Sequence, residues 1–436
     1  MTSSPRQTTT PIVPGAADIE SFVRSHRADL AEPPRPLPFA REEYSERLRR
    51  TRERMAIDDI DFLVVTSPES MCYLHGYSLR WYRAQSPLEW PPFVATVIHR
   101  DHDRLIHFDS FGEAAALRAT SIVEDVRFYP ERHWNPLAGA DNDDLRFFRD
   151  ELRSLKWPAK RFALELASPT PHPLFSQALQ ELLTSAGYEV VDGSAVLRDV
   201  RRRKSAQEIS YIEEAARIAD TGLLAVQQAC VPGASELAVW GSLVAAMAEA
   251  GGEHGAMHEC VVVGSIEEGH LCSSRRTMKT GDFVIADPAG VVNRYHANIS
   301  RTFFVGDEPP PAAQRLLEIA GGGFDVLCEV ATVGTPFTEV NRALRSYYAD
   351  SGIWDLRAWV GGYEMGISFP PDWVGPLQFT VEDEEDERII EDGMVTNFES
   401  IFHLPLLDTV VYQNSGTRCL SQLPRGLMVA PSDQSG

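Results

Sequence analysis

The sequence has few basic residues for its length, and this scarcity excludes one class of partner. Its 436 residues include 41 Lys and Arg against 63 Asp and Glu, so the formal net charge is −22 at pH 7. Nucleic-acid binding depends on clustered Lys and Arg side chains that neutralise phosphates. The dense basic run Arg201–Lys204 is typical of a solvated helix entrance. We therefore expect no nucleic-acid partner.

Long apolar runs and paired cysteine motifs are also missing. No apolar run approaches the roughly 18 residues that a membrane-spanning helix needs, and the N-terminal stretch Met1–Gly15 lacks the apolar core of a signal peptide. The six cysteines are scattered without a Cys-x-x-Cys pair, and several lie in apolar surroundings. These absences predict no membrane association, reduced and partly buried thiols, and a cytoplasmic location.

The composition that remains is globular, with 43% hydrophobic and 24% charged residues, and the length favours two domains. Residues 1–37 are rich in Ser, Thr and Pro and predict an extended arm with one short helix near Ala17–Leu30; a strap across a partner subunit is its alternative role. Residues 38–198 alternate strand-like and helix-like segments, which predicts a small α/β domain. Residues 199–436 form the second domain, whose first helix, Ser205–Ala229, begins with the capping-box pair Ser205 and Glu208.

Hydrophobic periodicity and turn residues place the other elements. The further predicted helices are Arg41–Met55, Leu145–Leu155, Pro173–Ala186, Glu236–Ala250, Pro311–Val330 and Phe337–Gly352. The predicted strands are Phe62–Thr66, Phe93–His99, Arg104–Asp109, Phe162–Glu165, Cys260–Val263, Phe283–Ala286 and Phe303–Val305.

Polar residues gather around three of these strands, between Glu259 and Asp307. His270 lies in a loop, Asp287 follows an apolar strand, and His296 and Arg301 come shortly afterwards. A carboxylate that ends a buried strand needs polar partners, because an unpaired buried charge is costly. Each residue alone is equally well explained as a helix cap or a loop residue, but four together favour a functional site.

Four segments in this order resemble the creatinase/prolidase superfamily (family M24), which has the pita-bread fold. They are Asp287 with Tyr295–Gly306, then Gly362–Ile367, Glu391–Glu399 and Leu407–Val411. The resemblance implies an α/β (α+β) chain: a small N-terminal α/β domain, then a pita-bread domain with a curved, largely antiparallel sheet covered by helices. It also implies a homodimer with a shared active site, in which the loop carrying Arg83 reaches the pocket of the neighbouring subunit.

The peptidases of that superfamily bind two metal ions through two aspartates, one histidine and two glutamates. By resemblance, Asp287 and Glu399 match one aspartate and one glutamate. Asn298, Tyr363 and Leu407 stand at the other three positions. A neutral amide and a leucine cannot replace anionic bridging ligands. The resemblance therefore predicts a site without metal and without any other cofactor.

Two carboxylates that share a pocket without a metal need a proton or another cation between them. An amidinium, guanidinium or ammonium group of a substrate satisfies this need, as in creatinase and ectoine hydrolase, the metal-free members of the superfamily. The spacing of His270 resembles that of the catalytic histidine of creatinase-like enzymes, and Phe369–Trp373 resembles an ectoine hydrolase signature. Ser300 departs from creatinase, where a glutamate is expected, and Glu399 is more acidic than the ectoine hydrolase pattern.

These resemblances assign roles to particular residues. The predicted catalytic residues are His270 as general base and acid, Asp287 and Glu399 as acids that hold the cation, and Tyr363 as a donor to a developing oxyanion. The predicted substrate-binding residues are His296, Trp373, Arg301 and Arg83. Packing in the core, or hydrogen bonding of the acids to Arg301, is the alternative for most of them.

The sequence thus predicts a metal-independent hydrolase that opens a C–N bond in a small, cationic, nitrogen-rich compound such as a cyclic amidine or a guanidino compound. Three alternatives stay open: a lyase on the same scaffold, a metal-dependent Xaa-Pro peptidase, and a non-catalytic protein that binds a small amine.

Overall fold

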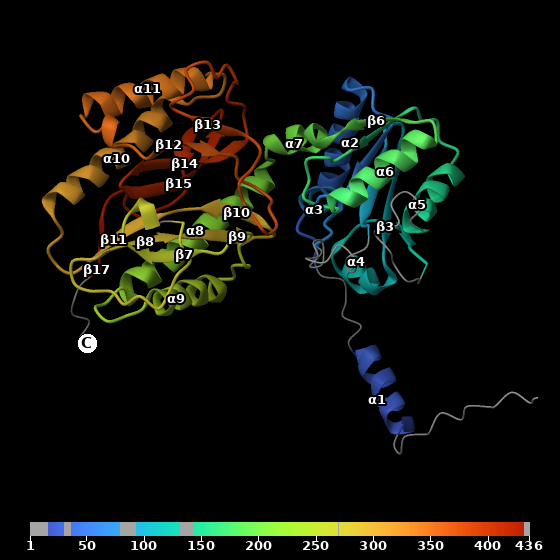
Figure 1. Cartoon of the computed structure of the whole chain (residues 1–436), viewed down its shortest axis with the longest axis horizontal. Helices are drawn as coiled ribbons and strands as arrows, with labels where there is room; N and C mark the ends of the chain where they lie inside the picture. The colour runs from blue at the N-terminus through green and yellow to red at the C-terminus, as the bar shows by residue number, and fades with distance from the viewer. Residues whose placement is uncertain (1–15, 30–35, 79–92, 131–142, 269, 431–436) are drawn as a thin grey trace, which may run out of the picture.

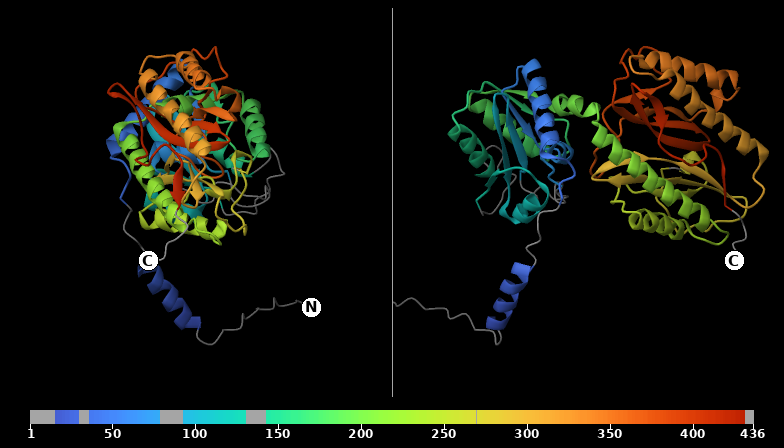
Figure 2. Two further views of the ribbon diagram at one scale, coloured as in Figure 1. Left: turned by 90° about the vertical axis from the view of Figure 1, so that its left-hand side faces the viewer. Right: turned by 180° about the vertical axis from the view of Figure 1, so that it is seen from behind.

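The computed structural model describes residues 16–29, 36–78, 93–130, 143–268 and 270–430. Two layered domains lie side by side and are joined by the helix α7 (Ser194–Arg202), as Figure 1 shows from the front and Figure 2 from behind. The domain boundary expected at residues 198 and 199 falls inside this helix. The first described helix, α1 (Ala16–Asp29), exposes Ile19 and Phe22 to solvent. Its role as a strap across a partner stays a prediction.

The N-terminal domain is built around a mixed six-stranded sheet with the order β4-β3-β2-β1-β5-β6. Its strands are β1 (Phe62–Val65), β2 (Ala95–His99), β3 (His102–Asp109), β4 (Asp125–Phe128), β5 (Arg161–Leu164) and β6 (Glu189–Asp192). Its helices are α2 (Arg41–Ile57), α3 (Pro68–His75), α4 (Ala114–Thr120), α5 (Asp143–Ser154) and α6 (Pro173–Ser185), followed by α7.

Helices cover both faces of this sheet because its central strand is apolar at every position. All four residues of β1 are buried. Successive side chains of a strand point to opposite faces, so Phe62 and Val64 join the cluster with Phe148 of α5, whereas Leu63 and Val65 join the cluster with Met55 of α2. A continuous apolar run is the pattern of a strand that is buried on both sides.

The C-terminal domain contains a four-stranded sheet of order β17-β11-β8-β7, a β10-β9 hairpin and a five-stranded sheet of order β13-β12-β14-β15-β16. The strands are β7 (Cys260–Val263), β8 (Phe283–Asp287), β9 (Ala289–Val292), β10 (Tyr295–Asn298), β11 (Arg301–Val305), β12 (Trp359–Tyr363), β13 (Gln378–Thr380), β14 (Met394–Phe402), β15 (Leu404–Gln413), β16 (Gly416–Cys419) and β17 (Met428–Ala430). An isolated bridge between Ser300, which lies between β10 and β11, and Leu407 of β15 connects the five-stranded sheet to the strands that precede it and joins them in one curved surface.

Two pairs of helices pack on the outside of this curved surface. The helices α8 (Ala206–Ala229) and α9 (Glu236–Glu249) cover one half, and α10 (Pro311–Val330) and α11 (Phe337–Asp350) cover the other (Figure 1). The predicted capping box of α8 is present: Ser205 Oγ accepts from the Glu208 N–H at 3.3 Å, and the Ser205 N–H donates to the Glu208 carboxylate at 2.8 Å. The predicted fold class, an α/β domain followed by a pita-bread domain, is confirmed.

Two further observations bear on the composition-based predictions. Of the helices in the described ranges, none is both long and apolar enough to cross a bilayer. The six cysteines form no disulfide; Cys230 is buried, Cys272 is exposed and the other four lie between these extremes. The cytoplasmic location stays a prediction.

Candidate functional site

Four strands of the C-terminal domain bring the candidate residues to one place. Asp287 ends β8, Asn298 ends β10 and Tyr363 ends β12. Glu399 lies in the middle of β14, directly opposite Leu407 on β15. Residues distant in sequence thus meet because the curved surface brings the ends of β8, β10 and β12 close to the middle of β14.

Hydrogen bonds connect these side chains directly. The Asn298 amide donates to Asp287 Oδ1 at 2.8 Å, and the Tyr363 hydroxyl donates to Asn298 Oδ1 at 3.4 Å. The Trp373 indole N–H donates to Tyr363 Oη at 3.2 Å. Asp287, Tyr363 and Trp373, which the sequence predicted as site residues, therefore belong to one cluster.

Asn397 belongs to the same cluster, and sequence reasoning missed it. Its Nδ2 donates to Glu399 Oε1 at 2.8 Å, and its Oδ1 accepts from the Tyr363 backbone N–H at 2.8 Å. The signal was the motif Glu391–Glu399 itself, because Asn397 lies two residues before Glu399 and side chains at that spacing share a face of a strand.

Burial shifts the acid–base properties of this cluster. Burial raises the pKa of Asp287 to about 6, against the hydrogen bond from Asn298 and the charge of His270, which lower it. Burial and then the charge of Asp287 raise the pKa of Glu399 to about 7, against hydrogen bonds from Asn397 and Tyr363. Burial and both acids also raise the pKa of Tyr363. Near neutral pH the two carboxyl groups therefore retain protons for part of the time.

The donor set of the cluster does not fit a dinuclear metal centre. Asn298 directs its amide N–H groups at Asp287, and the apolar Leu407 is paired with Glu399 across the sheet. In the described ranges, no three His, Cys, Asp or Glu side chains are grouped so that they could hold a metal ion. Two bridged metal ions need several anionic ligands, which this cluster does not supply.

His270 lies beside the cluster without being bonded to it. It occupies an exposed turn after the short helix Ile266–Glu268. Its charge is close enough to lower the pKa of Asp287. Its catalytic role stays a prediction.

The position of His296 argues against the predicted contact with substrate. The ring is fully buried, its Nε2 accepts from the Ala256 N–H at 3.0 Å, and its Nδ1 lies 2.8 Å from the Arg294 carbonyl oxygen. Burial, together with the charge of Arg294, lowers the pKa of His296 to about 3. The neutral ring thus uses both nitrogens to hold backbone groups, and we correct its assignment to a structural one.

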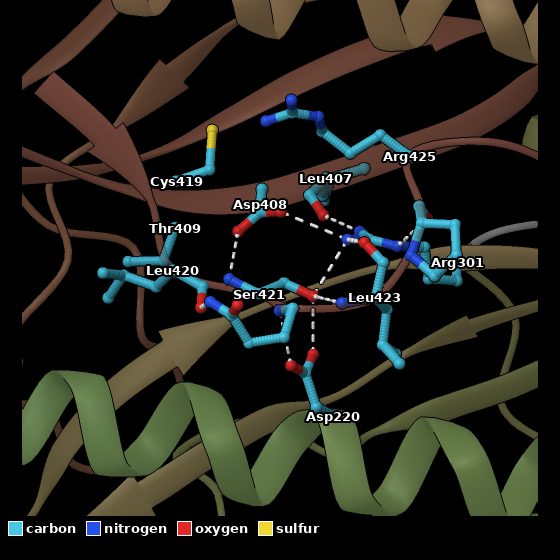
Figure 3. A network of polar contacts seen from close by, with 12 residues as sticks. Asp220, Arg301, Leu407, Asp408, Thr409, Cys419, Leu420, Ser421, Leu423 and Arg425 are labelled. Atoms are coloured by element: carbon cyan, nitrogen blue, oxygen red, sulfur yellow. Dashed lines mark hydrogen bonds and ion pairs between the residues drawn. The ribbon is translucent and has the colours of Figure 1, made fainter.

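Arg301 is likewise a structural residue. Its guanidinium is completely buried, pairs with Asp408 at 3.1 Å, and donates to Ser421 Oγ at 2.9 Å and to the Leu407 carbonyl oxygen at 2.7 Å (Figure 3). Ser421 in turn donates to Asp220 of α8 at 2.6 Å. The prediction that Arg301 binds substrate, and the alternative that it neutralises Asp287 or Glu399, are both wrong because its donors are engaged in this network.

Trp373 and Arg83 are the two other residues that the sequence predicted to bind substrate. Trp373 is 3% exposed and packs in the core, while its N–H holds Tyr363. It therefore forms a wall of the cluster and positions the tyrosine. Arg83 lies outside the described residues, so its predicted contact stays a prediction.

Comparisons with known proteins identify the family of the chain and its fold. The family model of metallopeptidase family M24 matches residues 210–418, and the model of the creatinase/prolidase N-terminal domain matches residues 47–203. The ectoine hydrolase of Halomonas elongata is 25% identical over 413 residues, covering 90% of this chain and 98% of that protein. A Xaa-Pro dipeptidase of Pyrococcus horikoshii is also 25% identical, over 393 residues that cover 88% of this chain and 99% of the relative.

Solved structures show the same fold. A dipeptidase PepE from Mycobacterium ulcerans superposes with a TM-score of 0.70 at 21% identity, covering 90% of this chain and 99% of that structure. Two matching domain models in the expected order, together with nearly full-length relatives, establish that the chain belongs to the creatinase/prolidase superfamily, within the hydrolase family M24.

Proposed function

We propose that the chain is a metal-independent hydrolase that opens a C–N bond in a small cationic compound, such as a cyclic amidine or a guanidino compound. The observation that carries this proposal is the pair Asp287 and Glu399, held beside Asn298, Tyr363 and Leu407 rather than beside metal ligands. The nearly full-length similarity to an ectoine hydrolase supports the same substrate class.

A cationic substrate relieves the electrostatic strain of this pair. The raised pKa values of Asp287 and Glu399 mean that desolvation disfavours two negative charges in the cluster. An amidinium or guanidinium group placed between them compensates both charges and donates hydrogen bonds to their oxygens. Its binding therefore lowers both pKa values and releases protons from the site.

His270 is proposed to accept a proton from the attacking water and to return it to the departing nitrogen. An imidazole can do both near neutral pH. Tyr363 stabilises the developing charge at the attacked carbon through its hydroxyl group. Asn397 is a positioning residue, because it holds Glu399 and the backbone of Tyr363 at once.

A metal-dependent Xaa-Pro peptidase is the second candidate, because a full-length Xaa-Pro dipeptidase is as similar in sequence as the ectoine hydrolase. The substitutions Asn298 and Leu407 stand against it, since two of the anionic ligands are replaced by groups that cannot bridge metals. The two candidates differ in both substrate and metal requirement.

A substrate panel separates the candidates. We expect the chain to hydrolyse ectoine, hydroxyectoine or creatine in the presence of a chelator, and not a Xaa-Pro dipeptide, with products whose summed mass exceeds that of the substrate by one water. His270→Ala should abolish turnover, whereas the exposed His258→Ala should not. A summed product mass equal to that of the substrate would favour a lyase, and normal turnover by His270→Ala would end the assignment of that residue.

A further inference from the structure

A second cavity, of about 480 Å³, lies between the two domains. Its N-terminal wall includes Ser67–Glu69 and Arg201, and its C-terminal wall includes Glu364 and Phe369–Asp372. Small-molecule sites commonly have volumes of this order and lie at domain interfaces. None of the catalytic candidates Asp287, His270 and Glu399 lines it.

Arg201 brings a positive charge to this cavity, near Glu69, whose carboxyl pKa is raised by burial and lowered by the charge of Arg201. Its Nη1 is buried and has no hydrogen-bond partner. Across the described ranges Arg201 forms no ion pair, whereas the adjacent Arg202 pairs with Asp199 and Arg203 pairs with Glu391. A buried guanidinium donor without a partner is costly, so this position favours an anionic group of a ligand.

Glu364 brings the opposite charge from the other wall. Its side chain is nearly buried, Oε1 accepts from Lys204 Nζ at 2.5 Å, and Oε2 has no hydrogen-bond partner. One oxygen is thus neutralised by the lysine and the other is left without a donor. A ligand ammonium or amidinium group supplies such a donor with matching charge.

Glu165 also lines the cavity, but its carboxylate already has hydrogen-bond partners within the protein. Glu165 accepts from the backbone N–H groups of Thr66 and Ser67, both at 2.7 Å, and from the Ser70 hydroxyl at 2.6 Å. Its carboxylate serves to hold the start of α3. The atoms without hydrogen-bond partners are therefore Arg201 Nη1 and Glu364 Oε2, on opposite walls.

We propose that the interdomain cavity is a second binding site, for a small zwitterion whose carboxylate contacts Arg201 and whose ammonium or amidinium group contacts Glu364. The cavity is separate from the catalytic cluster, because Tyr363 and Glu364 are consecutive in an extended segment and point to opposite sides. The loop Phe369–Asp372 lines the cavity, and Trp373, which follows it, holds Tyr363. The proposal does not depend on which reaction the cluster performs.

Calorimetric titration with charge-matched probes tests this proposal on the full chain. L-ornithine and ectoine carry both charges, putrescine lacks the carboxylate of ornithine, and pentanoate lacks the ammonium groups. We expect at least one zwitterion to bind about tenfold or more tightly than either incomplete probe, because two charge-assisted contacts replace one. Equal affinities for ornithine, putrescine and pentanoate, or no binding of either zwitterion, would overturn the proposal.

Variants locate the binding site. Arg201→Gln removes the Nη1 donor that lacks a partner and should weaken zwitterion binding about tenfold or more. A thermal melt of this variant shows whether loss of the charge beside Glu69 disturbs folding. Glu364→Gln should weaken zwitterion binding too, and a thermal melt of that variant shows whether loss of the Lys204 partner disturbs folding. Asp287→Asn is the matched control, since it alters the catalytic cluster alone and should retain interdomain binding. Binding lost in Asp287→Asn but unchanged in Arg201→Gln would assign the ligand to the catalytic cluster and contradict the second site.

Discussion

Asp287 and Glu399 are two acids in one buried cluster, and their raised pKa values of about 6 and about 7 make the stability of the fold depend on pH. A raised carboxyl pKa means that the folded chain binds protons more tightly than the unfolded chain. The resulting stabilisation is complete below the unfolded pKa of about 4 and is lost as the pH rises through the folded values. Stability from this source therefore falls between mildly acidic and neutral pH.

The double variant Asp287→Asn/Glu399→Gln should lack this dependence. Relative to it, we expect the wild-type free energy of unfolding to decrease by about 2 kcal/mol or more between about pH 5 and about pH 8. Urea unfolding at several pH values measures the difference. The exposed-acid variant Glu329→Gln/Asp350→Asn is a matched control. Parallel profiles for wild type and the site variant would show that the two acids have ordinary pKa values.

Removing the hydroxyl group of Tyr363 tests its predicted role in the reaction. Tyr363→Phe keeps the ring but removes the hydroxyl that contacts Asn298 and Trp373. We expect kcat to fall about 10²-fold with little change in KM, as for the loss of a donor used mainly in the transition state.

Tyr347→Phe removes a hydroxyl from the same domain, where it donates to the Ile319 carbonyl oxygen at 2.9 Å, away from the cluster. It should leave kcat unchanged. A rise in KM alone in Tyr363→Phe would mean that the hydroxyl binds the ground state and transition state equally.

At the residue scale, motif reasoning found the acids but misjudged their neighbours. Asp287 follows a predicted strand, and Glu399 ends the motif Glu391–Glu399 that resembles the superfamily. The bonds that make His296 structural come from Ala256 and Arg294. These contacts depend on how a preceding loop folds back, which residue types alone do not specify.

Among the elements, the Arg301 network joins strands β11 and β15 to helix α8. Arg301→Met should destabilise the fold by about 3–5 kcal/mol, because it leaves the buried Asp408 carboxylate without its cation. Chemical denaturation measures this loss. The double variant Arg301→Met/Asp408→Leu should recover part of it, and an equal loss in both variants would mean that packing, not charge, dominates.

The elements themselves were largely predictable, but their pairing was not. Periodicity and capping residues placed α8, α10 and β8 within one or two residues of their observed ends. Strand order depends on contacts between distant segments, such as the parallel pairing of Phe303 in β11 with Met428 in β17. Such long-range pairs leave no local sequence signal.

For the whole molecule, we predict a homodimer in which the loop carrying Arg83 contributes to the neighbouring site. Light scattering of the active enzyme should give about 97 kDa, which is twice the chain mass of 48.5 kDa. Closed two-fold dimers are the commonest soluble oligomers. A mass of one chain at concentrations that support full activity would contradict the shared site.

At this scale the sequence predicted the fold class and the hydrolase family, because four motifs follow a fixed order in the C-terminal domain and strands alternate with helices in the N-terminal domain. The substrate could not be predicted in the same way, since it depends on a few side chains around Asp287 and Glu399. Enzymes on one fold often differ in substrate through such local changes. The ectoine hydrolase and the Xaa-Pro dipeptidase are each 25% identical to this chain, so overall identity does not choose between their substrates.

The metal content of the purified, active chain tests the central claim most directly. After incubation with excess Mn²⁺ or Co²⁺ and desalting, elemental analysis should find far less than one metal ion per chain, with turnover unaffected by a chelator. Two tightly held ions per chain, with activity lost on chelation and restored by the metal, would contradict the account.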